Sequence, residues 1–583
     1  MLSPREREAI ASNVLSIIHE LFVHRRMKTA LHGIDVVPLL DSLRRRAAKL
    51  SDVDFHRAMR SLVNSVRDRH TRYSYASTSP SYSLPFVVER AFEAGAPAYF
   101  VTKSTHADIK AGSIIERWNT VPVELVVREL AEDIGASNDA ARRALAVRFL
   151  TARRADRFDP PAEHAVNLDL RLPNGSSSMV EVSWNSFALA PVSGLAPAST
   201  MTGQGVDADL LDSNRKLFEV FSPRFKQFAA TSYPNIDVRT VQHNGVDFGY
   251  LRVFDFSVED ADDFASFVAA KVGPLPASGL IIDLRGNPGG YIKAGELLLQ
   301  LFTSQRISPL GFRFRASDAV EHLLSTSDYF DAWEPTASQG TRLGEEHSGT
   351  FPIEDDEATF NKIGQVYSGP SVLIVDALTF STADIFTAGF LDHGIGQVIC
   401  TDENISAGGA NNWQHSVLRA AMPGFAFPLS AELELESGQA GPITVASFAS
   451  AGKTLSSAAV VKRLPDSDFG NFWEITDNGQ SYKIGKMVWL RNNLAAYFPG
   501  DNRFVDDLPA GVDFGFSIRQ GIRKRGGQGL VLEDEGIVAD HYYRMSATDV
   551  LSGNADLISY ACGLLSKPAT PRHAKIGLPP TSA

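Results

Sequence analysis

Two short apolar runs, each followed by a polar turn and a helix-like segment, constrain this chain more than any other feature. The first run is SGLIIDL at residues 278–284, and the second is SVLIVDAL at residues 371–378. A third run, GQVIC, follows at residues 396–400. Continuous apolar strands that alternate with helices are typical of a parallel sheet, because helical crossovers cover both of its faces. The pattern therefore predicts an α/β domain built on a parallel sheet.

The rest of the chain divides into segments of different character. Near the N-terminus, Ser51 and Asp54 have the spacing of a capping box, and the apolar residues that follow fall on one helical face. The last segment is predicted to contain a strand at 512–519 and a final helix near 547–566. The predicted order is a helical cap at 1–78, a small α+β module at 80–190, a connector at 191–240, the parallel-sheet domain at 241–419, an insertion at 420–505 and the rest of the parallel-sheet domain at 506–583.

Composition excludes several classes of protein. The chain carries 56 basic and 68 acidic residues, a formal net charge of −12, so its average surface repels nucleic acids and anionic membranes. Its two cysteines, Cys400 and Cys562, are too few for a disulfide framework or a zinc cluster, and no metal or cofactor is predicted. There is no run of about 18 apolar residues and no secretion signal. We therefore expect a cytoplasmic protein without a membrane span.

Both strand-to-helix turns carry groups that could perform chemistry, since sites in parallel sheets form where strands end. In the segment DLRGNPGG at 283–290, glycines can expose backbone N–H groups beside a helix N-terminus, which suits an anion. No Gly-Lys-Ser/Thr follows, so it is not a nucleotide phosphate loop. Asp283 and Arg285 are expected to pair and hold this turn. In the second turn, Ser381 lies where a nucleophilic serine would project, although a serine there is also a common helix cap.

Together the two turns resemble motifs of the tail-specific, or C-terminal-processing, serine peptidase family. Its members carry Asp-x-Arg-x-Asn-x-Gly-Gly and then a serine-rich turn that opens a helix, similar to LIIDLRGNPGG at 280–290 and TFSTADIF at 379–386. DRHT at 68–71 resembles the family's Asp-x-His-Thr, and GSIIERWNTVPV at 112–123 resembles a hairpin of a degenerate PDZ domain. The resemblance implies a crotonase-like parallel-sheet catalytic domain with an N-terminal helical cap and a PDZ-like α+β module.

The resemblance also implies roles for individual residues. One branch of the family uses a Ser–Lys dyad, but the matching segment at 401–412 contains no lysine. The chain is instead similar to the branch of the tricorn core protease and the retinoid-binding-protein repeats, in which a histidine is the base and a glutamate completes the relay. The match places the nucleophile on Ser381, the base on His70 and the glutamate on Glu533, within LEDEGIVAD. Arg69 stands where tricorn-like members have a serine, so that position is not matched.

The implied function is hydrolysis of peptide bonds, in unfolded or C-terminal segments, by a serine endopeptidase that forms an acyl-enzyme. Ser381 would attack, His70 would take its proton, and Glu533 would orient the imidazole. Backbone N–H groups would stabilise the oxyanion. The implied oxyanion donors belong to Gly289, Gly290 and Thr382. No metal or cofactor is implied, and the partner is a protein or peptide substrate.

Alternatives to this interpretation stay open on sequence alone. His70 follows an amphipathic helix and could simply stabilise its C-terminus. Glu533 stands beside Asp534 and Glu535, and an acidic trio is often a solvated turn, so either neighbour could be the partner of His70. The whole chain could also be a non-catalytic ligand- or peptide-binding protein on the same scaffold, or an esterase-type acyl hydrolase. The sequence indicates neither the substrate nor the oligomeric state.

Overall fold

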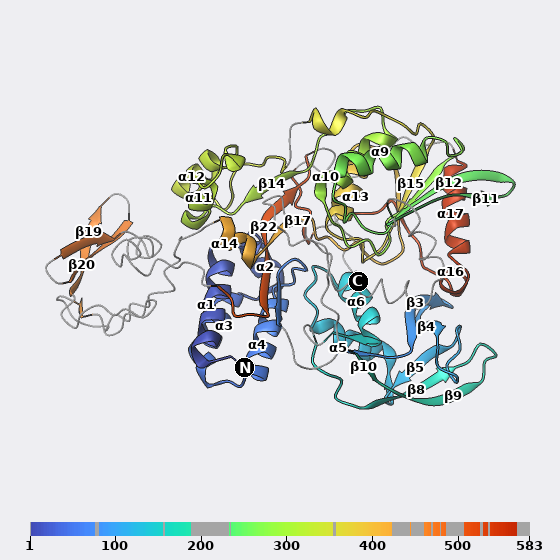
Figure 1. The fold of residues 1–583 in the computed structure, drawn as a ribbon, viewed down its shortest axis with the longest axis horizontal. Coiled ribbons are helices and arrows are strands. Elements are labelled where there is room, and N and C mark those ends of the chain that lie inside the picture. The colour runs from blue at the N-terminus through green and yellow to red at the C-terminus, as the bar shows by residue number, and fades with distance from the viewer. Residues whose placement is uncertain are drawn as a thin grey trace. The chain divides into compact units, whose positions relative to one another are not determined.

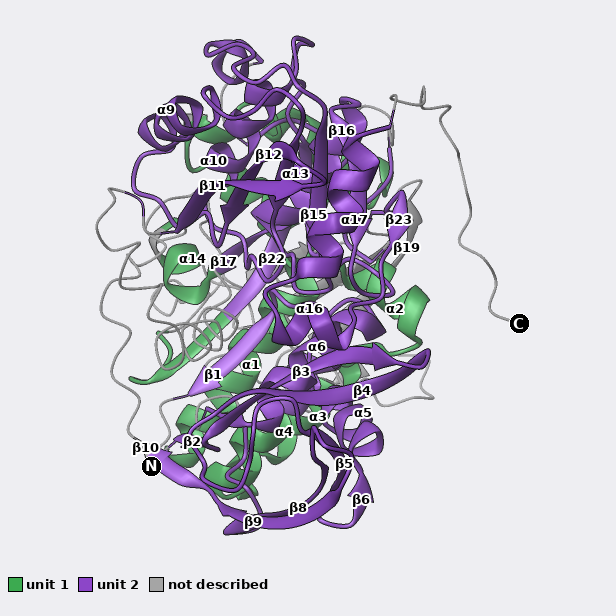
Figure 2. Cartoon of the chain, turned by 90° about the vertical axis from the view of Figure 1, so that its right-hand side faces the viewer, with its two compact units in different colours: residues 1–59, 314–349, 414–514 green, residues 60–313, 350–413, 515–583 purple. Residues whose placement is uncertain are grey.

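The computed structural model divides the chain into two compact units, which are coloured separately in Figure 2. One unit comprises residues 1–59, 314–349 and 414–514, and the other comprises 60–313, 350–413 and 515–583. The described residues are 2–75, 81–154, 158–187, 233, 235–353, 357–421, 507–524, 529–534 and 537–567, with the strands at 443–444, 460–467, 470–477 and 480–484.

The first unit is built mainly from helices. One of the two hydrogen bonds of the capping box predicted for its fourth helix is present, because the Asp54 N–H donates to the Ser51 hydroxyl over 3.2 Å. No helix among the described residues is long and apolar enough to cross a membrane. The elements are α1 (Pro4–Glu20), α2 (Arg25–His32), α3 (Val36–Arg46), α4 (Asp52–Asn64, which ends in the second unit), α11 (Asp318–Leu324), α12 (Glu334–Leu343), α14 (His415–Ala421), β18 (Ile443–Thr444), β19 (Val460–Ser467), β20 (Gly470–Asp477) and β21 (Gln480–Ile484).

The second unit contains the predicted parallel sheet. All three apolar runs are adjacent strands in it, and Leu373 of the second run pairs with Ile282 on one side and Val398 on the other. Neighbouring strands from β12 to β23 are parallel, and β11 pairs antiparallel with β12. The strand order is β11 (Ile236–His243), β12 (Val246–Val253), β13 (Leu280–Asp283), β15 (Ser371–Val375), β16 (Gly396–Cys400) and β23 (His541–Tyr542). This sheet confirms the predicted α/β class.

Helices cover both faces of this sheet (Figure 1). On one face α17 (Ala555–Leu565) packs against Ile281, Val372 and Ile399, which point to the same side of their strands. On the other face lie α9 (Ala261–Val272), α10 (Ile292–Leu299) and α13 (Thr382–Asp392). The prediction of a single helix near 547–566 is wrong in one respect. It is interrupted between α16 (Ala547–Leu551) and α17, because Gly553 and Asn554 adopt left-handed backbone angles.

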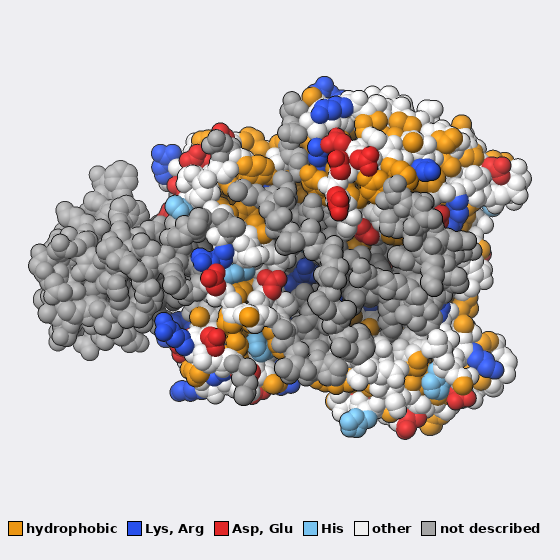
Figure 3. All heavy atoms as spheres, viewed as in Figure 1, with side chains coloured by type: hydrophobic (Ala, Val, Ile, Leu, Met, Phe, Trp, Pro, Cys, Tyr) orange, Lys and Arg blue, Asp and Glu red, His pale blue; other side chains and the backbone are white. Residues whose placement is uncertain are grey.

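Acidic side chains gather over α9 on the face that Figure 3 shows. The N-cap Asp260 accepts hydrogen bonds from the N–H groups of Asp262 and Asp263, both over 2.9 Å, and these two first-turn residues are acidic as well. Negative charge at a helix N-terminus is stabilising, because the helix macrodipole is positive there. Part of the net negative charge therefore has a local structural role.

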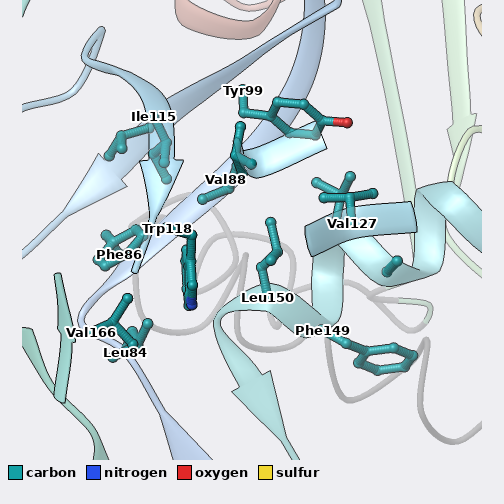
Figure 4. Close-up of a cluster of buried hydrophobic side chains, with 14 of the residues drawn as sticks. Leu84, Phe86, Val88, Tyr99, Ile115, Trp118, Val127, Phe149, Leu150 and Val166 are labelled. Carbon is teal, nitrogen blue, oxygen red and sulfur yellow. The ribbon is translucent and has the colours of Figure 1, made fainter. Parts of the chain in front are cut away.

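The α+β module at residues 80–190 has its own hydrophobic core. Trp118 lies at the centre of the cluster in Figure 4, together with Phe86 from the edge strand and Leu150 from the last helix. The sheet order is β3 (Phe86–Glu93), β4 (Ala96–Ser104), β5 (Ile114–Trp118), β8 (Ala165–Arg171) and β9 (Ser177–Ser183), with β6 (Val121–Pro122) beside β5; the helices are α5 (Val123–Glu132) and α6 (Asp139–Leu150). A separate small sheet has the order β10 (Asn185–Phe187), β2 (Ser81–Ser83) and β7 (Ala152–Arg153).

A further sheet is organised around one long strand, β22 (Val512–Ile522). Its order is β1 (Arg72–Tyr75), β22 and β14 (Gly311–Phe314), and β17 (Ala410–Gln414) also pairs with β22. The predicted strand at 512–519 is therefore present and extends three residues further. Most of the predicted connector at 191–240 and of the insertion at 420–505 lies outside the described residues, and the domain boundaries remain a prediction.

Candidate functional site: a serine–histidine pair

The turn after β13 is held by its own side chains. Asn287 donates from its side-chain amide to the Val253 carbonyl over 3.0 Å, and its side-chain oxygen accepts the Gly289 N–H over 2.9 Å. Gly289 and Gly290 have φ angles of 96° and 142°, a region that L side chains rarely adopt. The glycines are therefore needed for the shape of this turn.

A buried ion-pair cluster fixes the start of the same turn. Asp283 is fully buried and accepts hydrogen bonds from Arg285 at 2.7 Å, Arg252 at 2.9 Å and the Tyr250 hydroxyl at 2.7 Å. Burial opposes ionisation of this carboxyl group, but the two guanidinium groups outweigh burial and hold its pKa well below the usual range. The predicted Asp283–Arg285 pair is confirmed, and Arg252 joins it.

Ser381 occupies a strained position between β15 and α13. It is 3% exposed and has φ 59° and ψ −121°, a backbone conformation that costs a non-glycine residue about 1–3 kcal/mol. A nucleophilic serine on a sharp strand-to-helix turn adopts such a conformation because it lifts the hydroxyl out of the turn. The geometry differs from an ordinary helix cap, in which the cap residue has extended backbone angles.

The two turns are locked to each other. The Phe380 N–H donates to the Asn287 carbonyl over 2.9 Å, and the Gly286 N–H donates to the Asp376 side chain over 2.9 Å. A Cβ atom added at Gly289 would lie only 2.5 Å from the Ser381 Cβ. The glycine turn and the serine turn therefore form one compact structure.

His70 reaches this structure from a distant part of the chain. Its Nε2 lies 3.1 Å from the Ser381 Oγ, although 311 positions separate the two residues. The imidazole is 2% exposed and stacks on the Phe380 ring with 4.4 Å between centroids. Asp68 shapes the preceding turn, because its carboxylate accepts the His70 N–H and the Thr71 hydroxyl, both over 2.8 Å. The two residues predicted as base and nucleophile are thus brought together.

Glu533 lies in a segment that is docked on the same strand as the His70 turn. The Leu532 N–H donates to the Gly521 carbonyl of β22 over 3.0 Å, and the Ser517 N–H of β22 donates to the Thr71 hydroxyl over 3.3 Å. Glu533 is fully buried, whereas Asp534 is half-buried. Glu535 lies outside the described residues. The carboxylate role assigned to Glu533 remains a prediction.

Sequence reasoning did not assign a role to Asp384, which lies in the core of the site. Its Oδ2 accepts the Ser381 N–H over 3.2 Å and the Gly408 N–H over 2.8 Å, and its side chain is fully buried. Burial raises the pKa of this carboxyl group to about 8. The spacing Ser-x-x-Asp before an apolar run is a capping-box signature, and this signal could have drawn attention to the residue.

A cavity of about 470 Å³ lies between the α+β module and the turns that follow the parallel strands. Asp376 and Arg285 line it from the two turns described above, and β3 and α6 line it from the module. It is rich in arginine side chains, namely Arg90, Arg143, Arg148, Arg239, Arg252 and Arg285. Of these, Arg90 pairs with Glu403 over 2.8 Å. No group of three or more His, Cys, Asp or Glu side chains among the described residues is arranged to hold a metal ion.

Comparisons with known proteins agree with this architecture. Residues 247–416 match peptidase family S41, and residues 80–189 match a PDZ domain. Over 57 residues the chain is 39% identical to carboxy-terminal processing protease CtpB of Bacillus subtilis (strain 168), a match that covers 10% of this chain and 12% of CtpB. The chain thus matches only about an eighth of the length of that curated relative.

Two crystal structures of mature CPAF have a similar fold over nearly the whole chain. The TM-score is 0.59 at 14% identity for one, covering 98% of this chain and 99% of CPAF. The second, a complex with lactacystin, gives 0.58 at 14% identity and covers 97% of this chain and 99% of CPAF. At this level of identity the likeness establishes the fold.

The buried serine–histidine pair, beside a glycine turn on a parallel α/β sheet, has the arrangement of a nucleophile and a general base in serine hydrolases. More specifically, the chain carries a domain of peptidase family S41, preceded by a PDZ domain. The family and the fold class predicted from the motifs are confirmed.

Proposed function

We propose that this protein is a serine endopeptidase in which Ser381 forms an acyl-enzyme with the substrate. The observation that carries the proposal is the 3.1 Å separation between the Ser381 Oγ and the His70 Nε2. At this distance neutral His70 accepts the hydroxyl proton as Ser381 attacks the peptide carbonyl, and the imidazolium then protonates the leaving amine. A water molecule activated by the same ring then hydrolyses the acyl-enzyme.

Glu533 is the group that we assign to orient His70. Because Nε2 must accept the serine proton, Nδ1 carries the ring proton in the reactive tautomer, and a carboxylate at Nδ1 stabilises the imidazolium. Two observations support Glu533: it is fully buried, and its segment and the His70 turn both hydrogen-bond to β22.

The oxyanion donors that we assign are the backbone N–H groups of Gly290 and Thr382. The Thr382 nitrogen lies 2.9 Å from the place where a Gly289 Cβ would stand, so the glycine turn borders it directly. Gly289 itself is less suitable as a donor, because its N–H already donates to the Asn287 side chain. Loss of one such donor costs about 3–4 kcal/mol of transition-state stabilisation.

The substrate that we assign is an extended protein segment presented by the PDZ domain. β3 is an edge strand of its sheet, and an extended peptide can add by backbone hydrogen bonds to the part of this edge before Phe92, whose N–H already donates to the Met545 carbonyl over 2.8 Å. β3 and α6 line the cavity that Asp376 and Arg285 reach from the catalytic turns. Ser381 and His70 are not among the residues that line this cavity, so a bound segment must extend beyond Asp376 and Arg285 to reach them.

A fluorophosphonate probe, which reacts covalently with activated serines, tests the nucleophile directly. We expect the wild type to be labelled and the Ser381→Ala variant not to be. Ser113→Ala is the matched control, because Ser113 is also fully buried but lies in the PDZ domain, beside β5; it should be labelled as the wild type is. Absence of labelling in the folded wild type, or equal labelling of wild type and Ser381→Ala, would overturn the proposal.

The base is tested by the pH dependence of labelling. An imidazole base predicts a rate that rises through roughly pH 6–7, because only neutral imidazole can take the serine proton. His70→Ala should lower the rate by about 100- to 10,000-fold with the fold intact. A rate that rises only above about pH 9 would instead point to a lysine base.

A further inference from the structure

Asp384 joins two parts of the site that are distant in the sequence. It is the third residue of α13, and one of its carboxyl oxygens, Oδ2, accepts backbone hydrogen bonds from both Ser381 and Gly408. An ordinary capping-box acid accepts only the N–H of its own helix cap. The second bond, to Gly408, connects the start of α13 to the segment that follows β16.

The first of these bonds restrains the nucleophile. Ser381 has a φ angle of 59°, which costs about 1–3 kcal/mol and persists only where neighbouring contacts hold it. The bond from its N–H to Asp384 is such a contact. If the backbone relaxed, the hydroxyl would leave its place 3.1 Å from the His70 ring.

The second bond restrains the support of the base. A Cβ atom at Gly408 would lie 1.7 Å from the Phe380 ring, so the Gly408 backbone packs directly on this ring. The imidazole of His70 stacks on the same Phe380 side chain. The segment also meets the Glu533 region, because the Ala407 carbonyl accepts the Asp534 N–H over 3.4 Å.

The electrostatics of Asp384 are consistent with an uncharged acceptor. Burial raises its pKa to about 8, and the negative charge of Asp376, on the turn before α13, adds to the effect. Backbone N–H groups of Gly408, Ser381 and Ala407 favour the ionised form, but burial outweighs them and opposes ionisation near neutral pH. A neutral group beside the serine adds no negative charge where the tetrahedral oxyanion develops, whereas an ionised one would oppose that oxyanion.

We propose that Asp384 is a positioning residue of the reaction, which holds the Ser381 turn and the Gly408 segment together by accepting a hydrogen bond from each. The inference rests on the proposed serine-hydrolase function and deepens it. It predicts that asparagine, which is neutral and of the same shape, can replace Asp384, and that alanine cannot.

The test compares wild type, Asp384→Asn and Asp384→Ala with a fluorophosphonate probe at pH 7. Varying the probe concentration separates its affinity from the maximal labelling rate. We expect Asp384→Asn to keep the maximal rate within about threefold, and Asp384→Ala to lower it by about 30-fold or more, since misplacement of reacting groups by about 1 Å costs on the order of 100-fold. Probe affinity should change little in either variant.

Asp260→Ala is the control for a helix cap that contributes to stability but not to the reaction, and urea unfolding measures the stability of each variant. One oxygen of Asp260 also accepts two backbone N–H groups at a helix N-terminus, on α9. Its alanine variant should unfold at lower urea concentration without slower labelling. If folded Asp384→Ala is labelled at the wild-type rate, or Asp384→Asn is as slow as Asp384→Ala, the inference is wrong. If the folded wild type is not labelled at all, the proposed serine-hydrolase function itself is wrong.

Discussion

Replacing Gly289 with alanine is expected to disable the site by a predictable movement of the nucleophile. The added Cβ would lie 2.5 Å from the Ser381 Cβ, whereas ordinary van der Waals contact begins at 3.4 Å. Relief of the overlap therefore requires a displacement of about 0.9 Å, and misplacement of reacting atoms by about 1 Å costs on the order of 100-fold in rate. The new methyl group would also lie 2.9 Å from the Thr382 nitrogen, the assigned oxyanion donor.

Gly95→Ala is the matched control for this variant. Gly95 has a φ angle of 85°, close to the 96° of Gly289, but no atom lies within 4 Å of an added Cβ. Both alanine variants should lose about 1–2 kcal/mol of unfolding free energy from left-handed backbone strain. Only Gly289→Ala brings the new methyl group into overlap with residues 380–382, so the difference between the two variants isolates the effect of this overlap.

The measurement is the rate of fluorophosphonate labelling at a probe concentration far below saturation, with urea unfolding of the same samples. We expect the labelling rate of Gly289→Ala to fall about 100-fold or more, and that of Gly95→Ala to stay within twofold of wild type. Labelling of folded Gly289→Ala at the wild-type rate would refute the reasoning, because it would mean that the glycine turn does not restrict the position of Ser381.

Three further predictions concern stability, each measured by urea unfolding. Asp283→Ala leaves the buried Arg285 without its carboxylate and should cost about 3–5 kcal/mol; a loss below 1 kcal/mol would contradict the ion-pair cluster. Glu403→Gln removes the partner of Arg90, but Glu403 is 44% exposed, so the loss should not exceed about 1 kcal/mol. Burial raises the pKa of the Asp384 carboxyl group from 3.8 to about 8, so the unfolding free energy of the wild type should fall as pH rises from about 4 to 8. Asparagine does not titrate, so Asp384→Asn should gain stability relative to wild type over that range. Parallel pH profiles of the two proteins would contradict this.

The sheet could be predicted from sequence because its strands are local signals. The run GQVIC has the same first and last residues as β16, and the runs at 278–284 and 371–378 contain β13 and β15. Each run is apolar because helices cover both faces of the sheet, so the pattern needs no knowledge of distant contacts. The break between α16 and α17 was missed because left-handed angles at Gly553 and Asn554 interrupt a pattern whose apolar residues continue on both sides.

The site could be predicted only in part, for a physical reason. The Ser381 and His70 motifs are short and each stays within one turn, so they can be identified before the fold is known. The contacts of Asp384 depend on Gly408, which lies 24 positions away and is brought to it by the crossover from α13 through β16. That Asn287 engages the Gly289 N–H is likewise a property of the folded turn.

The position of His70 in the sequence determines when the candidate site can form during synthesis. His70, the proposed base, precedes the entire PDZ domain, Ser381 follows it, and the segment of Glu533 is synthesised later still. When Ser381 leaves the ribosome, the nascent chain therefore still lacks β22, the strand to which the His70 turn and the Glu533 segment are hydrogen-bonded. On the proposed mechanism, the nascent chain cannot complete the site before β22 has been synthesised, and the region 247–416 expressed alone would contain Ser381 without His70.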